Sequence, residues 1–525
     1  MSKVVILAVN SKYIHSTLAV WVLAQAVKEF AQIPHDISVI ETNINQNDSD
    51  IVSQVAVHSP DVVGISTYIW NAHRLPDILA ELRTALPNTV IVLGGPEASY
   101  NADFWYGCGA DYVLSGEGER KFPALLDELS GAVAQEIPQG SVFVDPFTDE
   151  YLASLKGKIA YIETSRGCPY RCAYCLSGDS KLEHFPIDTV RVQIEKLASS
   201  DVRVIKFVDR TFNANANRAC EIIEHIISLD SSNRFHFEVS ADIFDDRTIE
   251  LLSSASFGLF QIEAGLQSFF SPALKASNRH TNNDKAVKNL SKLLQAGNIH
   301  IHVDLIAGLP YETLEDFKYS FDKAYEIGAH KLQLGFLKML HGSAMRQNER
   351  EIIFCENPPY EIISSPWISK DDLKQLKIAE GALQNTYNKG HFLSTLQYVL
   401  STTKMRPFEL YHALGIAVSN ERQSLEQYAE RIFTFFSTLP NISQTAMLDH
   451  MIFDWLQMVK GSNMPVFMKI ATKKQLDEIR QAAQSILGRK IRRNEAAALS
   501  DGRGIFVDSE NRNPTTKLYY IHSIT

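Results

Sequence analysis

Short apolar runs alternate with amphipathic stretches through the first two thirds of this chain. In the N-terminal part, apolar runs predict strands at residues 4–9, 37–40, 61–66, 90–93 and 112–114. The stretches between them have helical periodicity. Strand–helix alternation of this kind predicts a doubly wound parallel sheet covered by helices on both faces. Ligands of such sheets bind outside the carboxyl ends of the strands.

The same alternation continues in the central part of the chain. Six strands are expected, at residues 160–163, 204–208, 234–239, 259–263, 299–305 and 331–336. Amphipathic helices separate them. Six strand–helix units predict a partial (β/α)6 barrel, in which functional groups stand at the carboxyl ends of the strands.

The remaining third changes character, because its apolar positions recur mostly at helical spacing. We therefore expect an α/β chain with a mostly α-helical C-terminal domain. The predicted divisions are an N-terminal domain at residues 1–140, a linker at 141–156, the barrel at 157–345 and the helical domain at 346–525. The last domain is expected to cap the barrel and select the substrate.

Composition is that of a globular intracellular protein. Hydrophobic residues make up 45% and charged residues 21%, and the formal net charge of −10 argues against nucleic acid as a dominant partner. No apolar stretch approaches the ~18 residues of a membrane span. The opening apolar run is too short for a signal peptide. Cytoplasmic localisation is the expectation.

Three of the six cysteines stand within eight positions, just after the first barrel strand. Cys168, Cys172 and Cys175 form a C-x3-C-x2-C pattern. Three thiolates can ligate three irons of a 4Fe–4S cube and leave the fourth iron open for chemistry. A structural zinc site is the alternative, although tetrahedral zinc normally takes four ligands in two separated pairs. A disulfide framework suits small secreted chains, which this is not.

The cysteine segment, with Tyr174 before its last cysteine, resembles the radical S-adenosylmethionine (SAM) enzymes. That resemblance implies a 4Fe–4S cluster whose open iron is chelated by SAM. Reductive cleavage of SAM then gives a 5′-deoxyadenosyl radical. The reaction implies an electron donor such as flavodoxin or ferredoxin.

Three segments follow predicted strands of the N-terminal domain, at residues 66–71, 94–97 and 116–119. This ordered set carries a resemblance to the cobalamin-binding domain that precedes many radical SAM domains. It implies cobalamin contacts for residues in these segments and in the loop after the first strand, namely Tyr13, Ser66, Thr67, Tyr68, Gly94, Gly95, Pro96, Glu97, Gly116, Glu117 and Gly118. A flavodoxin-like or nucleotide-binding domain is the alternative, because such glycine turns occur there too.

One feature of many cobalamin proteins is missing here. Where histidine ligates cobalt, the loop after the first strand carries Asp-x-His-x-x-Gly. In this chain His15 has Tyr13 at the position of the Asp and Leu18 at that of the Gly. We therefore expect His15 to be a loop or helix-start residue, with a cobalt that histidine does not ligate.

The ends of the barrel strands carry polar residues that resemble SAM-binding segments. The resemblance implies that Tyr174 and the segment 306–308 lie by the adenine. It also implies contacts with the ribose or the aminocarboxyl group by carboxylates and an amide. The expected SAM-binding residues are Tyr174, Asp209, Glu238, Glu263, Gln267 and Ile306. Each polar member also fits a structural role as a helix cap.

The resemblance covers about residues 1–345 and points to a cobalamin-dependent radical SAM enzyme. The expected activity is methylation of an unactivated carbon by way of the 5′-deoxyadenosyl radical and methylcobalamin. The substrate, a small molecule or a peptide, is not indicated. The alternatives are a cyclase or rearrangement enzyme with the same cofactors, and a non-catalytic cobalamin-binding protein.

Overall fold

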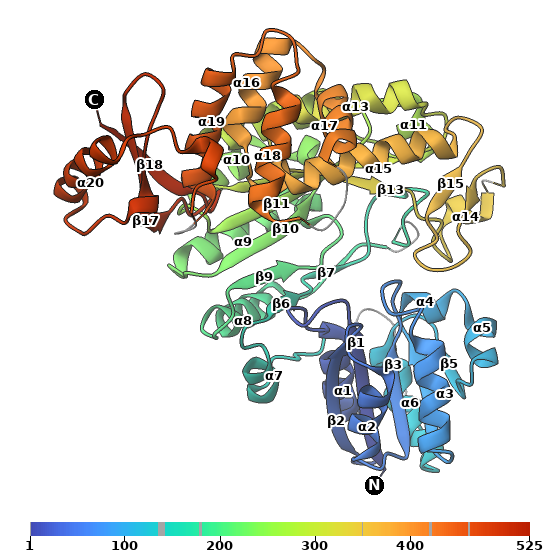
Figure 1. The fold of residues 1–525 in the computed structure, drawn as a ribbon. Helices are drawn as coiled ribbons and strands as arrows, with labels where there is room; N and C mark the ends of the chain where they lie inside the picture. The colour runs from blue at the N-terminus through green and yellow to red at the C-terminus, as the bar shows by residue number, and fades with distance from the viewer. Residues whose placement is uncertain are drawn as a thin grey trace. The chain divides into compact units, whose positions relative to one another are not determined.

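The structure is a computed structural model that describes residues 2–134, 142–177, 181–348, 350–418, 423–459 and 463–524. The chain divides into two compact units. Unit 1 comprises residues 1–251, 277–280 and 337–363, and unit 2 comprises residues 252–276, 281–336 and 364–525. Figure 1 labels the helices and strands along the chain.

Unit 1 begins with five strands that alternate with helices. The elements are β1 (Lys3–Asn10), α1 (Leu18–Phe30), β2 (Asp36–Asn43), α2 (Asp48–Ala56), β3 (Val62–Ser66), α3 (Leu75–Ala85), β4 (Val90–Gly94), α4 (Pro96–Ser99), α5 (Ala102–Gly107), β5 (Tyr112–Leu114) and α6 (Gly118–Leu129). The sheet order is β2-β1-β3-β4-β5, and every pairing is parallel. In this order β1 and β3 are neighbours, and the chain runs from β1 toward one edge of the sheet and from β3 toward the other. Ligands of such sheets usually bind at the point where the strand order reverses in this way.

Helices cover both faces of this sheet, as predicted. Val63 and Ile65 of β3 pack in one apolar core with side chains of α2 and α3. Gly64, between them, faces the other way, and a Cβ there would lie 3.0 Å from the Phe122 ring of α6. Because strand side chains alternate between faces, α2 and α3 cover one face and α6 covers the other.

The rest of unit 1 holds the first three barrel strands and the cysteine loop. Its elements are α7 (Asp149–Ser154), β6 (Ile159–Ile162), β7 (Ser165–Arg166), β8 (Glu183–His184), α8 (Ile187–Ala198), β9 (Val204–Phe207), α9 (Ala216–Ser228), β10 (Arg234–Val239), α14 (Ala344–Asn348) and β14 (Ile353–Phe354). Strand β9 pairs in parallel with β6 on one side and β10 on the other. Two elements, α10 (Asp246–Ser254) and β15 (Ile362–Ser364), contain residues of both units.

Unit 2 holds the other three barrel strands and the helical C-terminal third. Its elements are β11 (Phe260–Gln267), α11 (Ser271–Ala276), α12 (Asn283–Ala296), β12 (His300–Ala307), α13 (Leu314–Glu326), β13 (Lys331–Phe336), α15 (Lys370–Asn385), α16 (Leu393–Thr403), α17 (Pro407–Val418), α18 (Leu425–Phe436), α19 (Gln444–Met458), α20 (Lys473–Leu487), β16 (Ala496–Ala498), β17 (Gly504–Arg512) and β18 (Tyr519–Ile524). Strand β12 pairs in parallel with β11 and β13. Strand β17 pairs antiparallel with β16 and β18.

The predicted fold class is confirmed, since all eleven predicted parallel strands form and the C-terminal third is mostly helical. The apolar pattern of the C-terminal third did not predict helix α16. This helix follows Phe392, whose φ of +57° is left-handed, and it has no side-chain N-cap hydrogen bond. The usual start signal is therefore missing. The domain divisions stay predictions, and the one at residue 140 lies outside the described residues.

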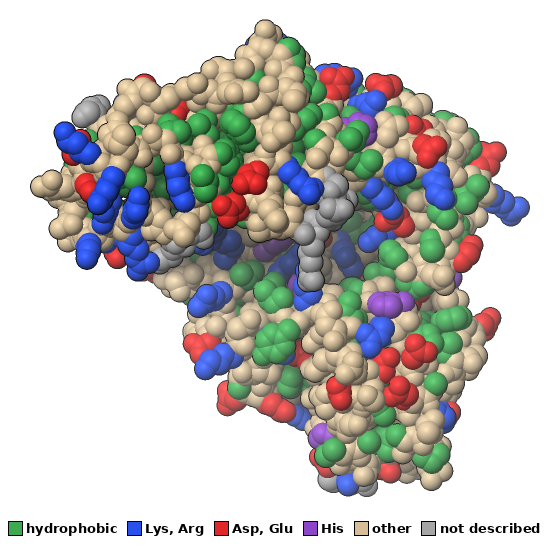
Figure 2. Space-filling model, in the orientation of Figure 1, with side chains coloured by type: hydrophobic (Ala, Val, Ile, Leu, Met, Phe, Trp, Pro, Cys, Tyr) green, Lys and Arg blue, Asp and Glu red, His purple; other side chains and the backbone are tan. Residues whose placement is uncertain are grey.

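The C-terminal module, residues 463–524, differs in charge from the rest of the chain. It contains eleven Lys and Arg residues against six Asp and Glu residues, although the whole chain carries a formal charge of −10. Figure 2 shows Lys and Arg side chains gathered on this module. Arg489, however, is held internally, with its guanidinium 3.2 Å from Glu495 and 3.6 Å from Asp508.

A buried carboxylate in unit 2 makes stability depend on pH. Glu312 is fully buried before α13, where it accepts hydrogen bonds from the Ser268 and Ser320 hydroxyls. Burial raises the pKa of Glu312 to about 8, which the two hydroxyls only partly oppose. The folded state therefore retains a proton that the unfolded chain releases above its ordinary pKa of 4.5.

We predict that the free energy of unfolding falls as the pH rises from about 5 to 8, by an amount on the order of 2–4 kcal/mol from this group. Glu312→Gln should flatten that part of the profile, because the amide stays neutral throughout. Thermal unfolding midpoints between pH 5 and 9 measure this. Glu315→Gln, at an exposed carboxylate, is the control. A Glu312→Gln profile as steep as that of the unchanged protein would contradict the assignment.

Candidate functional site

The loops after β3 and β4 meet at the carboxyl end of the five-stranded sheet. The backbone N–H and the hydroxyl of Thr67 both donate to the carbonyl oxygen of Gly94, at 2.7 and 2.8 Å. The same hydroxyl accepts from the backbone N–H of Ala98, at 2.9 Å. Gly95 has a φ of +102°, and a Cβ there would lie only 2.5 Å from the Thr67 carbonyl oxygen. Two of the three predicted cobalamin segments are therefore in direct contact, and Gly95 makes the contact possible.

Large apolar side chains are exposed on the loops at this end of the sheet. Tyr13 and Ile14, after β1, are 72% and 45% exposed, and Trp70, after β3, is 37% exposed. The Trp70 ring stacks on Tyr68, with the ring centroids 4.2 Å apart. A large flat ligand such as a corrin fits this surface.

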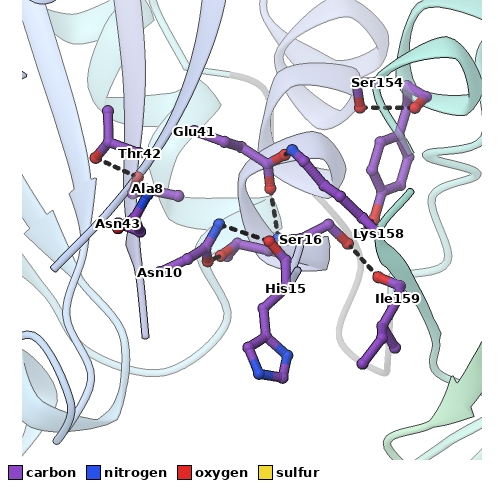
Figure 3. Close-up of polar contacts among 12 residues, drawn as sticks. Ala8, Asn10, His15, Ser16, Glu41, Thr42, Asn43, Ser154, Lys158 and Ile159 are labelled. Carbon is purple, nitrogen blue, oxygen red and sulfur yellow. Dashed lines mark hydrogen bonds and ion pairs between the residues drawn. The ribbon is translucent and has the colours of Figure 1, made fainter. Parts of the chain in front are cut away.

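The loop after β1 is fastened to its surroundings by polar contacts (Figure 3). Glu41 of β2 accepts from the backbone N–H of Thr17 at 2.5 Å and from Lys158 Nζ at 2.6 Å. The Ser16 hydroxyl donates to the carbonyl oxygen of Ile159, at 3.1 Å. These bonds join the β1–α1 loop to the beginning of β6.

His15 lies in this fastened loop, and its ring has a protein partner. Its Nδ1 is 2.5 Å from the Tyr161 hydroxyl of β6. Burial lowers the pKa of His15, and the nearby Lys12 lowers it further. This arrangement agrees with the prediction that His15 is a loop residue.

Arg166 links the loop after β5 to the cysteine loop. Its guanidinium lies 3.1 Å from Glu117 and 2.7 Å from Glu119. The same group lies 2.7 Å from Glu163, at the end of β6. Glu117 also pairs with Arg120, at 2.8 Å. The predicted cobalamin residue Glu117 is therefore ion-paired to the residue that lies two positions before Cys168.

Burial shapes the charges in this cluster. Burial raises the pKa of Glu163, and the hydrogen bond from Arg166 partly reverses the effect. For Arg166, burial favours the neutral form, but the hydrogen bond and charge of Glu163 together with the charge of Glu119 raise its pKa. The guanidinium is thus kept charged, and three carboxylates depend on it.

Asp209 holds the beginning of the cysteine loop. It is buried after β9, where its carboxylate accepts from the Thr164 backbone N–H at 3.0 Å and the Thr164 hydroxyl at 2.7 Å. The Ser165 hydroxyl donates to it as well, at 2.5 Å. Asp209 was predicted to contact SAM, which stays a prediction, and its carboxylate here accepts hydrogen bonds from the start of the loop.

Each of the three cysteine sulfurs has a polar neighbour. The Cys168 sulfur lies 3.5 Å from the Thr211 hydroxyl, and the Cys172 sulfur lies 3.7 Å from Arg279 Nη1. The Cys175 sulfur accepts from the backbone N–H of Ser177, at 3.4 Å. All three cysteines are free thiols. Hydrogen-bond donors beside the sulfurs suit thiolates and the sulfurs of a cluster, whose negative charge they stabilise.

The chemistry of the three thiols suits an iron–sulfur cube, in which each cysteine ligand binds a different iron. Among the described residues, no three His, Cys, Asp or Glu side chains are gathered around one metal position.

The predicted SAM-binding residues are divided between the units. In unit 1, the buried Tyr174 hydroxyl has no hydrogen-bond partner among the described residues, and Glu238 pairs with Lys206 at 3.2 Å. In unit 2, Glu263 and Gln267 lie on β11 and Ile306 lies on β12. Their contacts with SAM stay predictions.

Gln267 has an unusual conformation at the end of β11. Its φ is +69°, and its buried side-chain carbonyl oxygen has no partner in the described part of the chain. A Cβ on Gly265 would lie 2.1 Å from the Gln267 amide nitrogen, so the glycine makes room for this side chain. A strained residue with an unpaired acceptor is typical of a ligand-binding position.

Sequence reasoning missed Arg279 and Thr211. Arg279 follows α11 and stacks over the Tyr170 ring, with its guanidinium carbon 5.6 Å from the centroid. Burial opposes its charge, but the nearby Tyr174 and Cys172 raise its pKa. Nothing in the local pattern around Arg279 marks it, because it lies about a hundred positions from the cysteine that it contacts.

Three family models match the chain. A B12 binding domain matches residues 4–126, the radical SAM superfamily matches residues 162–324, and a family of proteins of unknown function, DUF4080, matches residues 348–501. The first two confirm the predicted resemblance to cobalamin-dependent radical SAM enzymes. They also support the expected cofactors, which are cobalamin, a 4Fe–4S cluster and SAM. No helix in the described ranges is both long enough and apolar enough to cross a membrane.

Curated relatives match at low identity. A 2-(S-pantetheinyl)-carbapenam-3-carboxylate methyltransferase from Streptantibioticus cattleyicolor is 24% identical over 324 residues, which are 52% of this chain and 46% of the relative. The cobalamin-dependent radical SAM methyltransferase TokK from Streptomyces tokunonensis is 24% identical, with the same coverage of 52% and 46%. The matched part is thus about half the length of these relatives.

Solved structures share the fold. The cobalamin-dependent SAM radical enzyme OxsB, with aqua-cobalamin and SAM bound, has a TM-score of 0.58 at 15% identity, covering 86% of this chain and 78% of OxsB. The radical SAM methyltransferase TsrM from Kitasatospora setae, with cobalamin and a [4Fe-4S] cluster bound, has a TM-score of 0.56 at 16% identity, covering 68% of this chain and 78% of TsrM. At this identity the likeness concerns the fold.

We predict that Arg166→Ala lowers the free energy of unfolding by roughly 3 kcal/mol, because three partly buried carboxylates lose their shared cation. Arg191→Ala is the control, since its partners Asp188 and Glu221 are 91% and 44% exposed. That change should cost less than about 1 kcal/mol. Denaturant unfolding measures both variants. Equal, small losses in the two would show that the Arg166 cluster contributes no more than a surface pair.

Proposed function

We propose that this chain is a cobalamin-dependent radical SAM methyltransferase that methylates an unactivated carbon of a small molecule or peptide. The observation that carries the proposal is the Arg166 cluster. It ties the loop after β5, a predicted cobalamin segment, to the loop of the three cysteines. A chain that only carried cobalamin would have no need of a three-thiol loop at that position.

In this proposal the three cysteines hold the cluster, and the loops at the carboxyl end of the five-stranded sheet hold cobalamin. When bound, the cluster and SAM supply a hydrogen-abstracting radical, and cobalamin supplies the methyl group. Arg279 stabilises the Cys172 thiolate by hydrogen bonding and charge, and Thr211 lies beside the Cys168 sulfur. The exposed side chains of Tyr13 and Trp70 are covered by the corrin. The buried Tyr174 hydroxyl is assigned to SAM.

Asp209 is assigned a positioning role in the proposal, since its carboxylate holds Thr164 and Ser165 at the start of the cysteine loop. The assignment of SAM contacts to Glu238, Glu263, Gln267 and Ile306 is retained. Electrons are proposed to come from a flavodoxin or a ferredoxin. The curated relatives named as methyltransferases support methyl transfer over cyclisation or rearrangement.

The test uses anaerobically reconstituted protein with cobalamin, a reductant and SAM labelled in its methyl group. We expect both 5′-deoxyadenosine and S-adenosylhomocysteine. Cys172→Ala should lose most of its iron and form neither product, yet still bind cobalamin. Cys108→Ala, which removes a half-buried thiol outside the loop, is the control and should behave as the unchanged protein.

Two outcomes would change the assignment. Unchanged iron content and turnover in Cys172→Ala would refute the cluster site. Formation of 5′-deoxyadenosine without S-adenosylhomocysteine, in the presence of cobalamin, would favour the cyclase or rearrangement activity instead.

The cobalamin loops have their own test. Gly95→Ala should weaken cobalamin binding about tenfold, which corresponds to ~1.4 kcal/mol, because a Cβ there forces Thr67 to move. Gly109→Ala is a matched control, since Gly109 has nearly the same φ, +101°, but open space around its Cβ position. Absorbance titration with cobalamin measures both. Equal affinity of the two variants would argue against a corrin at this loop.

A further inference from the structure

We infer that residues 337–348 and 350–363, here called the latch segment, mechanically join the loop after β4 to the cysteine loop, with Glu97 and Tyr360 as its positioning residues. This inference rests on the proposed function for its purpose, because the two loops are those assigned to cobalamin and to the cluster. The contacts that form the latch are all between protein groups and do not depend on a ligand. The latch segment belongs to unit 1 together with both loops.

On the cobalamin side, the latch segment is held by a buried hydrogen bond. The Tyr360 hydroxyl donates to the Glu97 carboxylate, and the two residues are only 3% and 5% exposed. Gly342 adds a close approach, since a Cβ there would lie 2.3 Å from ring atoms of Tyr100. Glu97 and Tyr100 both lie just after the Gly94-Gly95 turn. Glu97 is also one of the residues predicted to contact cobalamin, and that contact stays a prediction.

On the cluster side, the latch segment bonds directly to the cysteine loop. The backbone N–H of Met345 donates to the carbonyl oxygen of Ala173, at 2.8 Å. Ala173 lies next to Cys172 and two positions before Cys175. Its own backbone N–H donates to the carbonyl oxygen of Ser277, at 2.9 Å, in the segment that carries Arg279. Any movement of Met345 is therefore passed to the backbone between two of the cysteines.

Within the latch segment, Arg346 joins the two ends into one block. Its guanidinium stacks over the Tyr360 ring at 5.0 Å and over the Phe354 ring at 4.8 Å. Arg346 Nη1 also donates to the carbonyl oxygen of Met339, at 2.6 Å. The Met339 N–H in turn donates to the carbonyl oxygen of Tyr360, at 2.9 Å. The path from Glu97 to Ala173 is thus an unbroken series of hydrogen bonds and stacked groups.

Burial explains why this connection is rigid. A buried carboxylate that loses its hydrogen-bond donor is left unsatisfied, so the Glu97–Tyr360 bond is costly to open. Burial raises the pKa of Glu97, while the bond from Tyr360 and the charge of Arg346 lower it. Burial also raises the pKa of the Tyr360 hydroxyl, and the contact with Glu97 raises it further, so this hydroxyl stays a donor.

The test is backbone hydrogen exchange of the protein without added ligand, read on peptides that cover residues 164–177. Tyr360→Phe should speed exchange there about fivefold, the factor expected when a hydrogen bond of ~1 kcal/mol is lost. Glu97→Ala should do the same, and the double variant should add little, because both changes open one contact. Glu97→Gln should stay near the unchanged protein, since the amide oxygen still accepts from the hydroxyl. Tyr106→Phe, at an exposed tyrosine, is the matched control.

A purely local role predicts a different result. If Tyr360→Phe speeds exchange only near residues 94–100 and 337–363, and leaves residues 164–177 unchanged, the latch is overturned. Faster exchange throughout the chain, with a matching fall in thermal midpoint, would also overturn it. Adding cobalamin to the unchanged protein and to Tyr360→Phe then tests the purpose of the latch. Cobalamin is expected to slow the exchange of residues 164–177 in the unchanged protein and not in Tyr360→Phe. Failure of the unchanged protein to form 5′-deoxyadenosine would count against the proposed function and not against the latch.

Discussion

The site depends on one guanidinium that is shared among three carboxylates. Arg166 lies near the start of the cysteine loop, two positions before Cys168, and contacts Glu117, Glu119 and Glu163. Removing four charges from water is costly, and the arrangement is stable only if all partners are present together. The Arg166 guanidinium and its three carboxylates are paired only when the loop after β5 and the beginning of the cysteine loop are both folded. The cluster therefore couples the folding of these two loops.

Buried carboxylates have the same organising role elsewhere in unit 1. Asp209 gathers the donors of Thr164 and Ser165, and Glu97 accepts from Tyr360. In each case the acid lies after a strand of a parallel sheet, where ligands are expected. In each case, however, its oxygens bond to protein groups that shape a loop. Asp209 and Glu97 thus fix the backbone of the loops beside the expected ligand sites, including the loop that carries the cysteines.

Much of the fold could be predicted from the sequence, because a parallel strand buried on both faces leaves a strong local signal. Strand β1 is an example, since residues 4–9 are apolar without interruption and all are buried. Helix α16 could not be predicted, because its start lacks a cap and follows a left-handed residue. The first three barrel strands lie in unit 1 and the others in unit 2, and no local pattern could indicate that division.

The candidate site was predictable where its residues are neighbours in the sequence. The spacing of Cys168, Cys172 and Cys175 and the glycine turns are local patterns of that kind. The contacts of Arg279 with Cys172, and of Tyr360 with Glu97, join residues more than a hundred positions apart. Such pairs have no periodicity or spacing to reveal them. For the same reason the sequence could not indicate that Glu97 bonds to Tyr360 or that Asp209 bonds to Thr164, since a lone acid after a strand looks alike whether it contacts a ligand or a loop.

The central claim is that one chain holds cobalamin and an iron–sulfur cluster on loops that are tied together. The most direct test is the metal content of the anaerobically reconstituted protein after unbound cofactors have been removed by gel filtration. The account predicts about one cobalt and about four irons on the same chain. Cobalt without iron, iron without cobalt, or zinc in the place of iron would contradict it.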